Sequence, residues 1–387
     1  MRLEETPEQQ ALRAELRAYF ELTLTPEVRE GLGPHPGEHC GPAYRAYVRQ
    51  LGQDGWLGIG WPVEFGGQGR SPLEQYIFFE ECDRARAPFP LVTLNTVGPT
   101  LMRYGSEEQK ASFLPRILRG EIHFAIGYTE PGAGTDLASL TTKAVCDGGD
   151  YVVNGQKIFT TGVHDADYLW LAARTAPDAP KHEGISVFIV ETGAPGFKVT
   201  PIETLDDGRT NSCYFADVRV AASSMVGAEN EGWKLITTQL NHERVALSRA
   251  GRIVRAYEDV LAWAKETGAI DRAWVRLTLA RVRAGLDAMR LLNWRMAWEM
   301  TRDQPSAADS SAAEVYGTEF MGEAYRLLLE VVGEAGALKA GSPGAVLRGE
   351  LEHDYRAALV FTFGGGVNEV QREIIATAGL GLPRSRR

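Results

Sequence analysis

The sequence is poor in cysteine, in long apolar runs and in positive charge. No CxxC spacing occurs, which argues against a disulfide framework and against a zinc site. We therefore predict no metal and interpret the four cysteines as packing side chains: Cys40, Cys82, Cys146 and Cys213. No apolar run approaches the length of a membrane span, and the N-terminal stretch MRLEETPEQQALRAEL has no apolar signal segment, so we expect a cytoplasmic protein.

The shortage of positive charge limits the choice of partners. The chain has 41 Lys and Arg residues against 51 Asp and Glu residues, a formal net charge of −10, and no dense basic block. Nucleic acids and anionic membrane surfaces bind positively charged patches, so we expect neither as a partner. The residues that are present, 44% hydrophobic and 24% charged in a length of 387, are typical of a globular protein with two or three domains.

The first third of the chain carries the signals of helices. Thr6 is a candidate N-cap, with Pro7 at the first helical position and Gln9 to close a capping box. The apolar residues that follow recur at every fourth position: Leu12, Leu16 and Phe20. Similar patterns predict further helices over residues 42–53, 73–84 and 106–119.

From about residue 123 the pattern changes to short strands. Runs such as YVVNGQKIF, YLWLAA and GISVFIVE are separated by Asp-Gly, Asn-Gly and other glycine-rich turns as far as residue 222. Long helical patterns then return. We therefore predict an α+β multidomain protein with an N-terminal helical domain over 1–122, a central antiparallel β domain over 123–222 and a C-terminal helical bundle over 223–387.

Two glycine-containing stretches of the β region are candidates for ligand binding. In YTEPGAGTDLASL, residues 128–140, the glycines permit close backbone approach, and Thr129 supplies a hydroxyl donor; a β-turn capped by Asp136 is the alternative. NGQKIFTTG, residues 154–162, is predicted to be a strand. In a strand, Phe159 and Thr161 would share one face and suit a flat heteroaromatic ring, although an ordinary half-buried strand has the same pattern.

Together, in this order, the two stretches resemble the flavin-binding middle domain of the acyl-CoA dehydrogenases. The resemblance extends over the whole chain, from the helical first third to the C-terminal GGGVNEVQREIIA. It implies the fold of that family, with a C-terminal four-helix bundle. It also implies FAD as the cofactor, an acyl-CoA as the substrate and an electron-transfer flavoprotein as the electron acceptor.

The same resemblance implies roles for single residues. Most family members have tryptophan at the position of Phe159, a departure that concerns how electrons leave the flavin. The positions that match flavin contacts are Ile126, Tyr128, Thr129, Gly134, Thr135, Phe159, Thr161, Val367 and Glu369. The positions that match substrate contacts are Thr135, Arg244 and Gly365, the last through its backbone N–H.

The usual catalytic glutamate of the family is missing from the C-terminal motif. Dehydrogenation of a thioester needs a base that removes the α-proton. FTFGGGVNEVQR, residues 361–372, has Gly364, Gly365 and Gly366 where that glutamate is expected. None of the three can act as a base, so a base would have to come from elsewhere in the chain.

The helical pattern at residues 232–252 offers Glu243. The predicted stripe on one face of this helix consists of Trp233, Ile236, Leu240, Glu243, Leu247 and Gly251. A carboxylate in such a stripe has to be paired, protonated or functional, because a bare buried charge is unfavourable. A salt bridge to Arg244, Arg249 or Arg252 is the structural alternative. The resemblance favours a base, since LNHERVAL matches the place from which isovaleryl-CoA and long-chain acyl-CoA dehydrogenases supply their glutamate.

Two further stretches depart from the family pattern. In homotetrameric members an Arg-x-x-Phe-Gly stretch reaches the FAD of a neighbouring subunit, but residues 265–282 are shortened and lack the Phe-Gly pair, and the glycine-rich segment at 329–344 is altered as well. We therefore expect a second, related subunit to complete the site. This chain most resembles the glutamate-bearing subunit of the actinobacterial α2β2 acyl-CoA dehydrogenases that act on steroid-CoA thioesters in sterol side-chain degradation.

The first functional hypothesis is α,β-dehydrogenation of a steroid-CoA with a short branched side chain, with Glu243 as the base. The three glycines would leave room for a ring system or an α-methyl branch, although glycine is equally expected where no base is needed. The alternatives are a short-chain or branched-chain acyl-CoA dehydrogenase, a non-catalytic scaffold subunit, and an oxidase or monooxygenase on the same fold. The intact YTEPGAGTD together with Glu243 favours catalysis.

Overall fold

The computed structural model describes residues 4–33, 41–247, 250–302 and 306–383, and in residues 240–247 it describes the backbone alone. The chain divides into two compact units. The helical unit comprises Met1–Gly37, Arg70–Pro88 and Arg244–Arg387, and the sheet unit comprises Glu38–Gly69 and Phe89–Glu243. The boundaries of the three predicted domains stay a prediction.

The first helix of the helical unit forms as its sequence predicts. α1 (Pro7–Thr23) starts at Thr6, whose side chain accepts a bond from the N–H of Gln9, while the Gln9 side chain accepts one from the N–H of Thr6. Its apolar stripe is buried: Leu12, Leu16 and Phe20. α2 (Pro26–Leu32) follows, and α1 packs against α4 (Pro72–Ala85).

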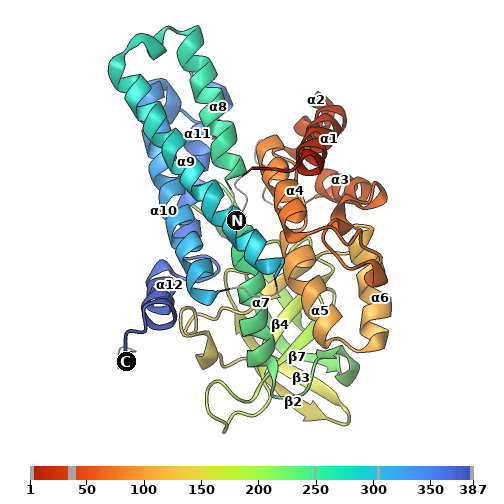
Figure 1. The fold of residues 1–387 in the computed structure, drawn as a ribbon. Helices are drawn as coiled ribbons and strands as arrows, with labels where there is room; N and C mark the ends of the chain where they lie inside the picture. Colours follow the sequence, from red (N-terminus) through yellow and green to blue (C-terminus); the bar gives the residue numbers. More distant parts are fainter. Residues whose placement is uncertain (1–3, 34–40, 248–249, 303–305, 384–387) are drawn as a thin grey trace. The chain divides into compact units, whose positions relative to one another are not determined.

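The rest of the helical unit is a bundle around α10 (Ala307–Val332). α8 (Gly251–Glu266) and α9 (Ala273–Met300) run alongside α10 (Figure 1). α10 also contacts α11 (Glu350–Ala358) and α12 (Asn368–Ile374). The bundle core is apolar, with fully buried side chains such as Ile253, Val275, Val282 and Leu328. The predicted C-terminal helical bundle is confirmed.

The predicted helix over residues 232–252 is two separate helices. α7 is Gly232–Leu247, and Gly251 begins α8. At Gly251 the backbones of α8 and α4 touch, since a Cβ on this residue would lie 2.2 Å from the backbone oxygen of Glu80. The predicted stripe from Trp233 to Gly251 is therefore wrong at its C-terminal end.

The described part of the sheet unit contains an eight-stranded sheet with the order β6-β7-β3-β2-β4-β5-β8, and β1 pairs with β4. The strands are β1 (Phe124–Gly127), β2 (Lys143–Asp147), β3 (Asp150–Lys157), β4 (Tyr168–Arg174), β5 (Ile185–Glu191), β6 (Phe197–Glu203), β7 (Arg209–Ala221) and β8 (Met225–Val226). Neighbouring strands are antiparallel, as predicted, except that β4 is parallel to β1 and to β2. One apolar core, which includes Leu169, Leu171 and Phe188, lies against this sheet.

The sheet unit also contains α3 (Pro42–Gln53), α5 (Gly98–Tyr104), α6 (Glu107–Leu118) and the first part of α7. The helices predicted over 42–53, 73–84 and 106–119 are confirmed as α3, α4 and α6. Ser71 and Ser106 form capping boxes at the starts of α4 and α6, so both helix starts are fixed by local sequence.

Candidate functional site

A buried carboxylate organises the loop that follows β1. Glu130 and Ala133 exchange backbone hydrogen bonds of 3.1 Å across the turn between them. The Glu130 carboxylate accepts bonds from the backbone N–H of Thr141 at 2.7 Å and of Thr142 at 2.9 Å, and it pairs with Lys157 at 2.8 Å. Sequence reasoning missed Glu130, although a charged residue between an apolar strand and a Pro-Gly turn is a usable signal.

Lys157 is fully buried at the end of β3. Its Nζ donates to the Glu130 carboxylate and, at 2.9 Å, to the backbone oxygen of Tyr128. Burial lowers the pKa of Lys157 to about 8, against the opposing effect of Glu130. Burial alone would raise the pKa of Glu130, but the charge and hydrogen bond of Lys157 outweigh it and hold that pKa at about 2. The pair is therefore charged at neutral pH and ties the loop to the strand.

The two sequence motifs lie next to each other in the sheet unit. The N–H of Ile158 donates to the backbone oxygen of Thr129 at 2.9 Å, which joins 154–162 directly to 128–140. Around this junction Ile126 and Thr129 are half-buried. Three further predicted site residues of the two motifs are exposed: Gly134, Thr135 and Thr161. We call the exposed part of the two joined motifs the rim. The rim therefore offers hydroxyl groups and open backbone to a ligand.

Phe159 and Thr161 do not alternate on a strand as predicted. β3 ends at Lys157, and Phe159 has a φ of 57°, in the left-handed region. The N–H groups of the residues on either side of Phe159 are both bonded, one to Thr129 and the other to Asn211 at 2.9 Å, so the turn is held from both sides. Phe159 is 60% exposed. A strained turn, and not a strand, presents the aromatic surface.

Tyr128 points into the sheet unit and not toward the rim. Its side chain is buried, and its hydroxyl accepts a bond from the indole N–H of Trp170 at 3.0 Å. The same hydroxyl donates to the side-chain oxygen of Gln239 in α7 at 2.8 Å. Sequence reasoning missed Trp170 and Gln239, which lie 42 and 111 residues from Tyr128 in the chain.

The loop of three glycines has a conformation that favours glycine. φ is 84° at Gly365 and 136° at Gly366. A Cβ on Gly366 would lie 2.6 Å from the side-chain nitrogen of Gln371. Val367 is half-buried before α12, and Glu369 is exposed in the first turn of that helix. The backbone conformation thus accounts for Gly365 and Gly366 without reference to a bulky substrate.

Buried polar side chains fill the space between α10 and α12. The Ser311 hydroxyl donates to the side-chain oxygen of Gln371 at 2.7 Å, and the Asn368 amide donates to the Thr318 hydroxyl at 3.1 Å. Glu314, which has no exposed surface, lies on the same face of α10 as Ser311 and Thr318. Sequence reasoning missed this cluster; its signal is the helical spacing of polar residues in SSAAEVYGTEF.

Glu243 and Arg244 belong to α7, but their side chains lie outside the described residues. The described part of α7 has a buried face formed by Leu235, Ile236 and Gln239. Trp233, which was predicted to share that face, is half-buried.

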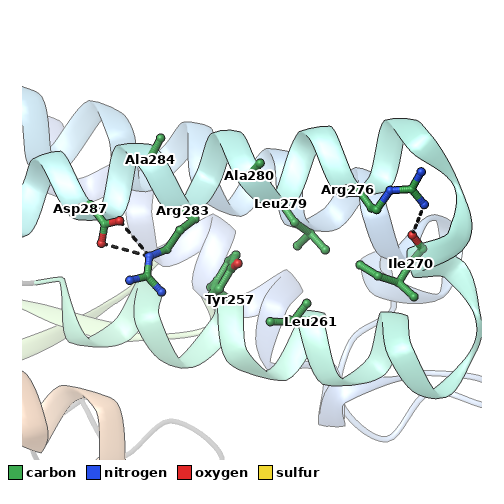
Figure 2. Close-up of a pocket in the computed structure, with 9 residues that line it drawn as sticks. All are labelled: Tyr257, Leu261, Ile270, Arg276, Leu279, Ala280, Arg283, Ala284 and Asp287. Carbon is green, nitrogen blue, oxygen red and sulfur yellow. Dashed lines mark hydrogen bonds and ion pairs between the residues drawn. The ribbon is translucent and has the colours of Figure 1, made fainter.

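An open hollow of about 480 Å³ lies between α8 and α9 in the helical unit (Figure 2). The shortened stretch 265–282 contributes four lining residues: Ile270, Arg276, Leu279 and Ala280. Arg276 donates to the backbone oxygen of Ile270 at 3.0 Å, and Arg283 pairs with Asp287 at 2.9 Å. Of the two guanidinium groups, only that of Arg283 is paired with a carboxylate.

The cysteines and acidic residues give no sign of a metal centre. Within the described ranges, no group of three or more His, Cys, Asp or Glu side chains is placed to hold a metal ion. Cys82 and Cys213 are buried, as predicted, but Cys146 is exposed because it lies at the end of β2 beside the turn to β3. Its interpretation as a packing residue is wrong, and Cys40 lies outside the described residues.

No helix in the part of the chain that the structure describes is both long and apolar enough to cross a membrane.

Comparison with known proteins matches the chain along nearly its whole length. Models of the N-terminal, middle and C-terminal domains of acyl-CoA dehydrogenases match residues 6–121, 125–218 and 230–380. The acyl-CoA dehydrogenase FadE26 of Mycobacterium tuberculosis is 53% identical over 400 residues, covering 100% of both chains.

Two solved structures contain chains with a similar level of sequence identity to this chain. The Tcur3481-Tcur3483 steroid ACAD contains a chain that is 55% identical, with a TM-score of 0.95 and full coverage of both chains. The ChsE4-ChsE5 complex from Mycobacterium tuberculosis contains one that is 53% identical, with a TM-score of 0.93 and the same coverage. The fold implied by the sequence motifs is therefore confirmed.

Proposed function

The chain belongs to the acyl-CoA dehydrogenase family, and from this premise we propose that it is the FAD-binding, base-carrying subunit of a heteromeric enzyme that dehydrogenates a steroid-CoA thioester between its α and β carbons. One observation carries this proposal: the chain is 53% and 55% identical, over its full length, to chains of a two-component complex and of a steroid ACAD. A substrate with a short branched side chain, as in sterol catabolism, remains our expectation.

We assign the removal of the α-proton to Glu243. Position 243 follows the buried Gln239 by four residues, and positions four apart lie on one face of a helix. The conformation of the glycine loop also supports the assignment. A residue with a side chain would be strained at the φ of Gly365, so a catalytic glutamate is not expected at that position. FAD, when bound, would accept the hydride from the β-carbon.

The thioester carbonyl needs hydrogen-bond donors, since these acidify the α-proton. Gly365 keeps its backbone N–H, and we propose that this group donates to the carbonyl oxygen. Arg244 and Thr135 are the further proposed substrate contacts. Thr135 is exposed at the rim of the sheet unit, which is compatible with that role.

The rim of the sheet unit fits one side of a flavin ring. The exposed Phe159 offers an aromatic face, and Thr129 and Thr161 offer hydroxyl groups beside it. The remaining proposed flavin contacts are Ile126, Tyr128, Gly134, Thr135, Val367 and Glu369. Tyr128 would act through its backbone or through packing, because its hydroxyl is bonded to Trp170 and Gln239.

A second acyl-CoA dehydrogenase-like subunit and an electron-transfer flavoprotein are the proposed partners. The missing Phe-Gly pair in residues 265–282 supports the need for a second subunit. The electron acceptor rests on the sequence resemblance, and both it and the cytoplasmic location stay predictions.

Glu243→Gln tests the assignment of the base. With the partner subunit co-expressed, we expect FAD to stay bound and its anaerobic bleaching by a steroid-CoA to slow by at least about 100-fold, the scale of general-base catalysis. Glu231→Gln is a matched control, because Glu231 is exposed just before α7. Bleaching of Glu243→Gln at the wild-type rate would refute the assignment. A wild-type enzyme bleached by isovaleryl-CoA but not by a steroid-CoA would favour the branched-chain alternative.

A further inference from the structure

The turn that carries Phe159 is bonded to one buried residue of β7. Asn211 lies in this strand, 51 residues beyond Thr160 in the chain, and has no exposed surface. Its backbone oxygen accepts from the N–H of Thr160 at 2.9 Å, and its side-chain amide donates to the backbone oxygen of Thr160 at 3.0 Å. Both backbone polar groups of Thr160, the residue between Phe159 and Thr161, are therefore bonded to Asn211.

The partners of the Asn211 amide fix which of its two end atoms is oxygen and which is nitrogen. The Nε atom of Arg209 can only donate, so the Asn211 atom 2.9 Å from it is the oxygen. The backbone oxygen of Thr160 can only accept, so the Asn211 atom bonded to it is the nitrogen. The Nδ1 atom of His164, 3.2 Å from the same nitrogen, then accepts from it and carries no proton. A reversed amide would lose the bonds to both Arg209 and Thr160.

The bonds to Asn211 stabilise a backbone conformation that is unfavourable for Phe159. Its φ of 57° lies in the left-handed region, where the Cβ of a residue comes close to the neighbouring backbone. In this conformation Phe159 is 60% exposed, whereas Thr160 is buried. The Thr161 hydroxyl lies 3.2 Å from that of Thr210, the residue before Asn211 in β7. One short segment of β7 thus holds the turn and also contacts the hydroxyl beside it.

We propose that Asn211 is a positioning residue for the flavin, because it holds the turn in the shape that presents the Phe159 ring and the Thr161 hydroxyl to the cofactor. This inference rests on the proposed function, in which Phe159 and Thr161 contact the flavin. A residue in an unfavourable backbone conformation persists only where its surroundings enforce it, and such residues are common at ligand sites. Asn211 is itself fully buried, so it acts on the ligand through the turn and not by direct contact.

Asn211→Asp tests the inference because an ionised aspartate keeps the size of the side chain and the acceptor for Arg209 but has no N–H for the Thr160 oxygen. Asn211→Ala is the second variant, since it removes the same donor without placing a charge in the interior. FAD affinity is measured with the co-expressed complex, as the free FAD that passes an ultrafiltration membrane over a dilution series. We expect both variants to bind FAD roughly 5- to 50-fold more weakly than the wild type, the scale of one or two lost hydrogen bonds.

A double-mutant cycle with Phe159→Ala separates positioning from general destabilisation. Phe159→Ala removes the exposed ring, so a distorted turn has less contact left to lose. We therefore expect the loss of FAD affinity in the double variant to be smaller than the product of the two single losses. Val218→Ala is the structural control, because Val218 is fully buried in the same strand. We expect this control to lower the unfolding temperature and to leave the FAD affinity unchanged.

The outcomes distinguish this inference from the proposed function. If the wild-type complex binds no FAD, the proposed function fails and this inference fails with it. If the wild-type complex binds FAD and both Asn211 variants bind it equally well, only the positioning role is wrong. Independent effects of Phe159→Ala and the Asn211 substitutions would also overturn that role, because Asn211 would then act elsewhere than through the turn. An equal loss of FAD affinity in Val218→Ala would overturn it as well, because the loss would then follow the stability of the sheet.

Discussion

Single residues, far apart in the chain, hold the rim of the sheet unit together. The Glu130–Lys157 pair is buried, and both partners make further bonds to the backbone of the loop. Removal of one partner of such a pair typically destabilises a protein by about 3–5 kcal/mol, because the other charge is left buried and unpaired. The pair therefore accounts for the fixed position of the rim. We expect a substitution of either residue to lower the free energy of unfolding, whether or not it also changes the activity.

His123 is a second buried titratable residue, and it predicts how stability depends on pH. Burial, assisted by the charge of Arg45, lowers its pKa from 6.5 to about 4, and Asp167 and Asp165 only partly oppose this. The unfolded chain therefore binds a proton between about pH 6.5 and pH 4 that the native state does not bind. By linkage, the free energy of unfolding falls as the pH falls through this window and is unaffected above it.

We expect His123 to lower the free energy of unfolding by up to about 3 kcal/mol between pH 7 and pH 4. His123→Phe removes the titration and keeps an aromatic ring next to Tyr44, whose ring centre is 5.3 Å from that of His123. Urea unfolding of both proteins at several pH values measures the effect as a difference, so other titrating groups cancel. Parallel pH profiles for the two proteins would contradict the prediction.

At the scale of the element, we expect a side chain at Gly366, the last glycine of the loop before α12, to destabilise the protein. Gly366→Ala places a Cβ at a φ of 136° and 2.6 Å from Gln371, so we expect a loss of about 1–3 kcal/mol of stability. Gly322→Ala in α10 is the control, because no atom lies within 4 Å of the added Cβ. That control should stabilise the helix by up to about 1 kcal/mol. Thermal unfolding of the two variants should therefore shift in opposite directions.

Elements whose start depends on neighbouring residues could be predicted from the sequence. The capping box of Thr6 and Gln9 and the four-residue spacing of Leu12 and Leu16 predict where α1 begins and which face it buries. The structure confirms both. The turn at Phe159 could not be predicted, because its positive φ depends on hydrogen bonds to residues from other parts of the sheet. The same holds for Glu130, whose cation is 27 residues away.

The end of α7 shows a different reason for a wrong prediction. The apolar pattern continues from Ile236 to Gly251, so spacing alone predicts one helix. In the structure Gly251 begins a second helix, and its backbone lies in close contact with that of Glu80 in α4. Such a contact between distant segments leaves no periodic signal in the sequence, whereas the glycine itself is a visible hint.

At the scale of the whole molecule, the similarity to chains from two-component enzymes predicts that this chain does not complete a site alone. In homotetrameric members of the family, an Arg-x-x-Phe-Gly stretch is expected to reach the FAD of a neighbouring subunit. Residues 265–282 of this chain lack the Phe-Gly pair. A second subunit of the same family would supply the missing contacts. Two copies of this chain would each lack them.

We therefore expect this chain, expressed alone, to bind substantially less than one FAD per chain, and the chain expressed with its partner subunit to form an assembly of two copies of each. The ratio of flavin absorbance to protein measures the first expectation, and light scattering measures the second. Addition of excess FAD to the lone chain is the control that separates weak binding from a missing supply of cofactor. A homotetramer with full FAD occupancy would refute the requirement for a partner, yet it would leave the proposed role of Glu243 open to its own test.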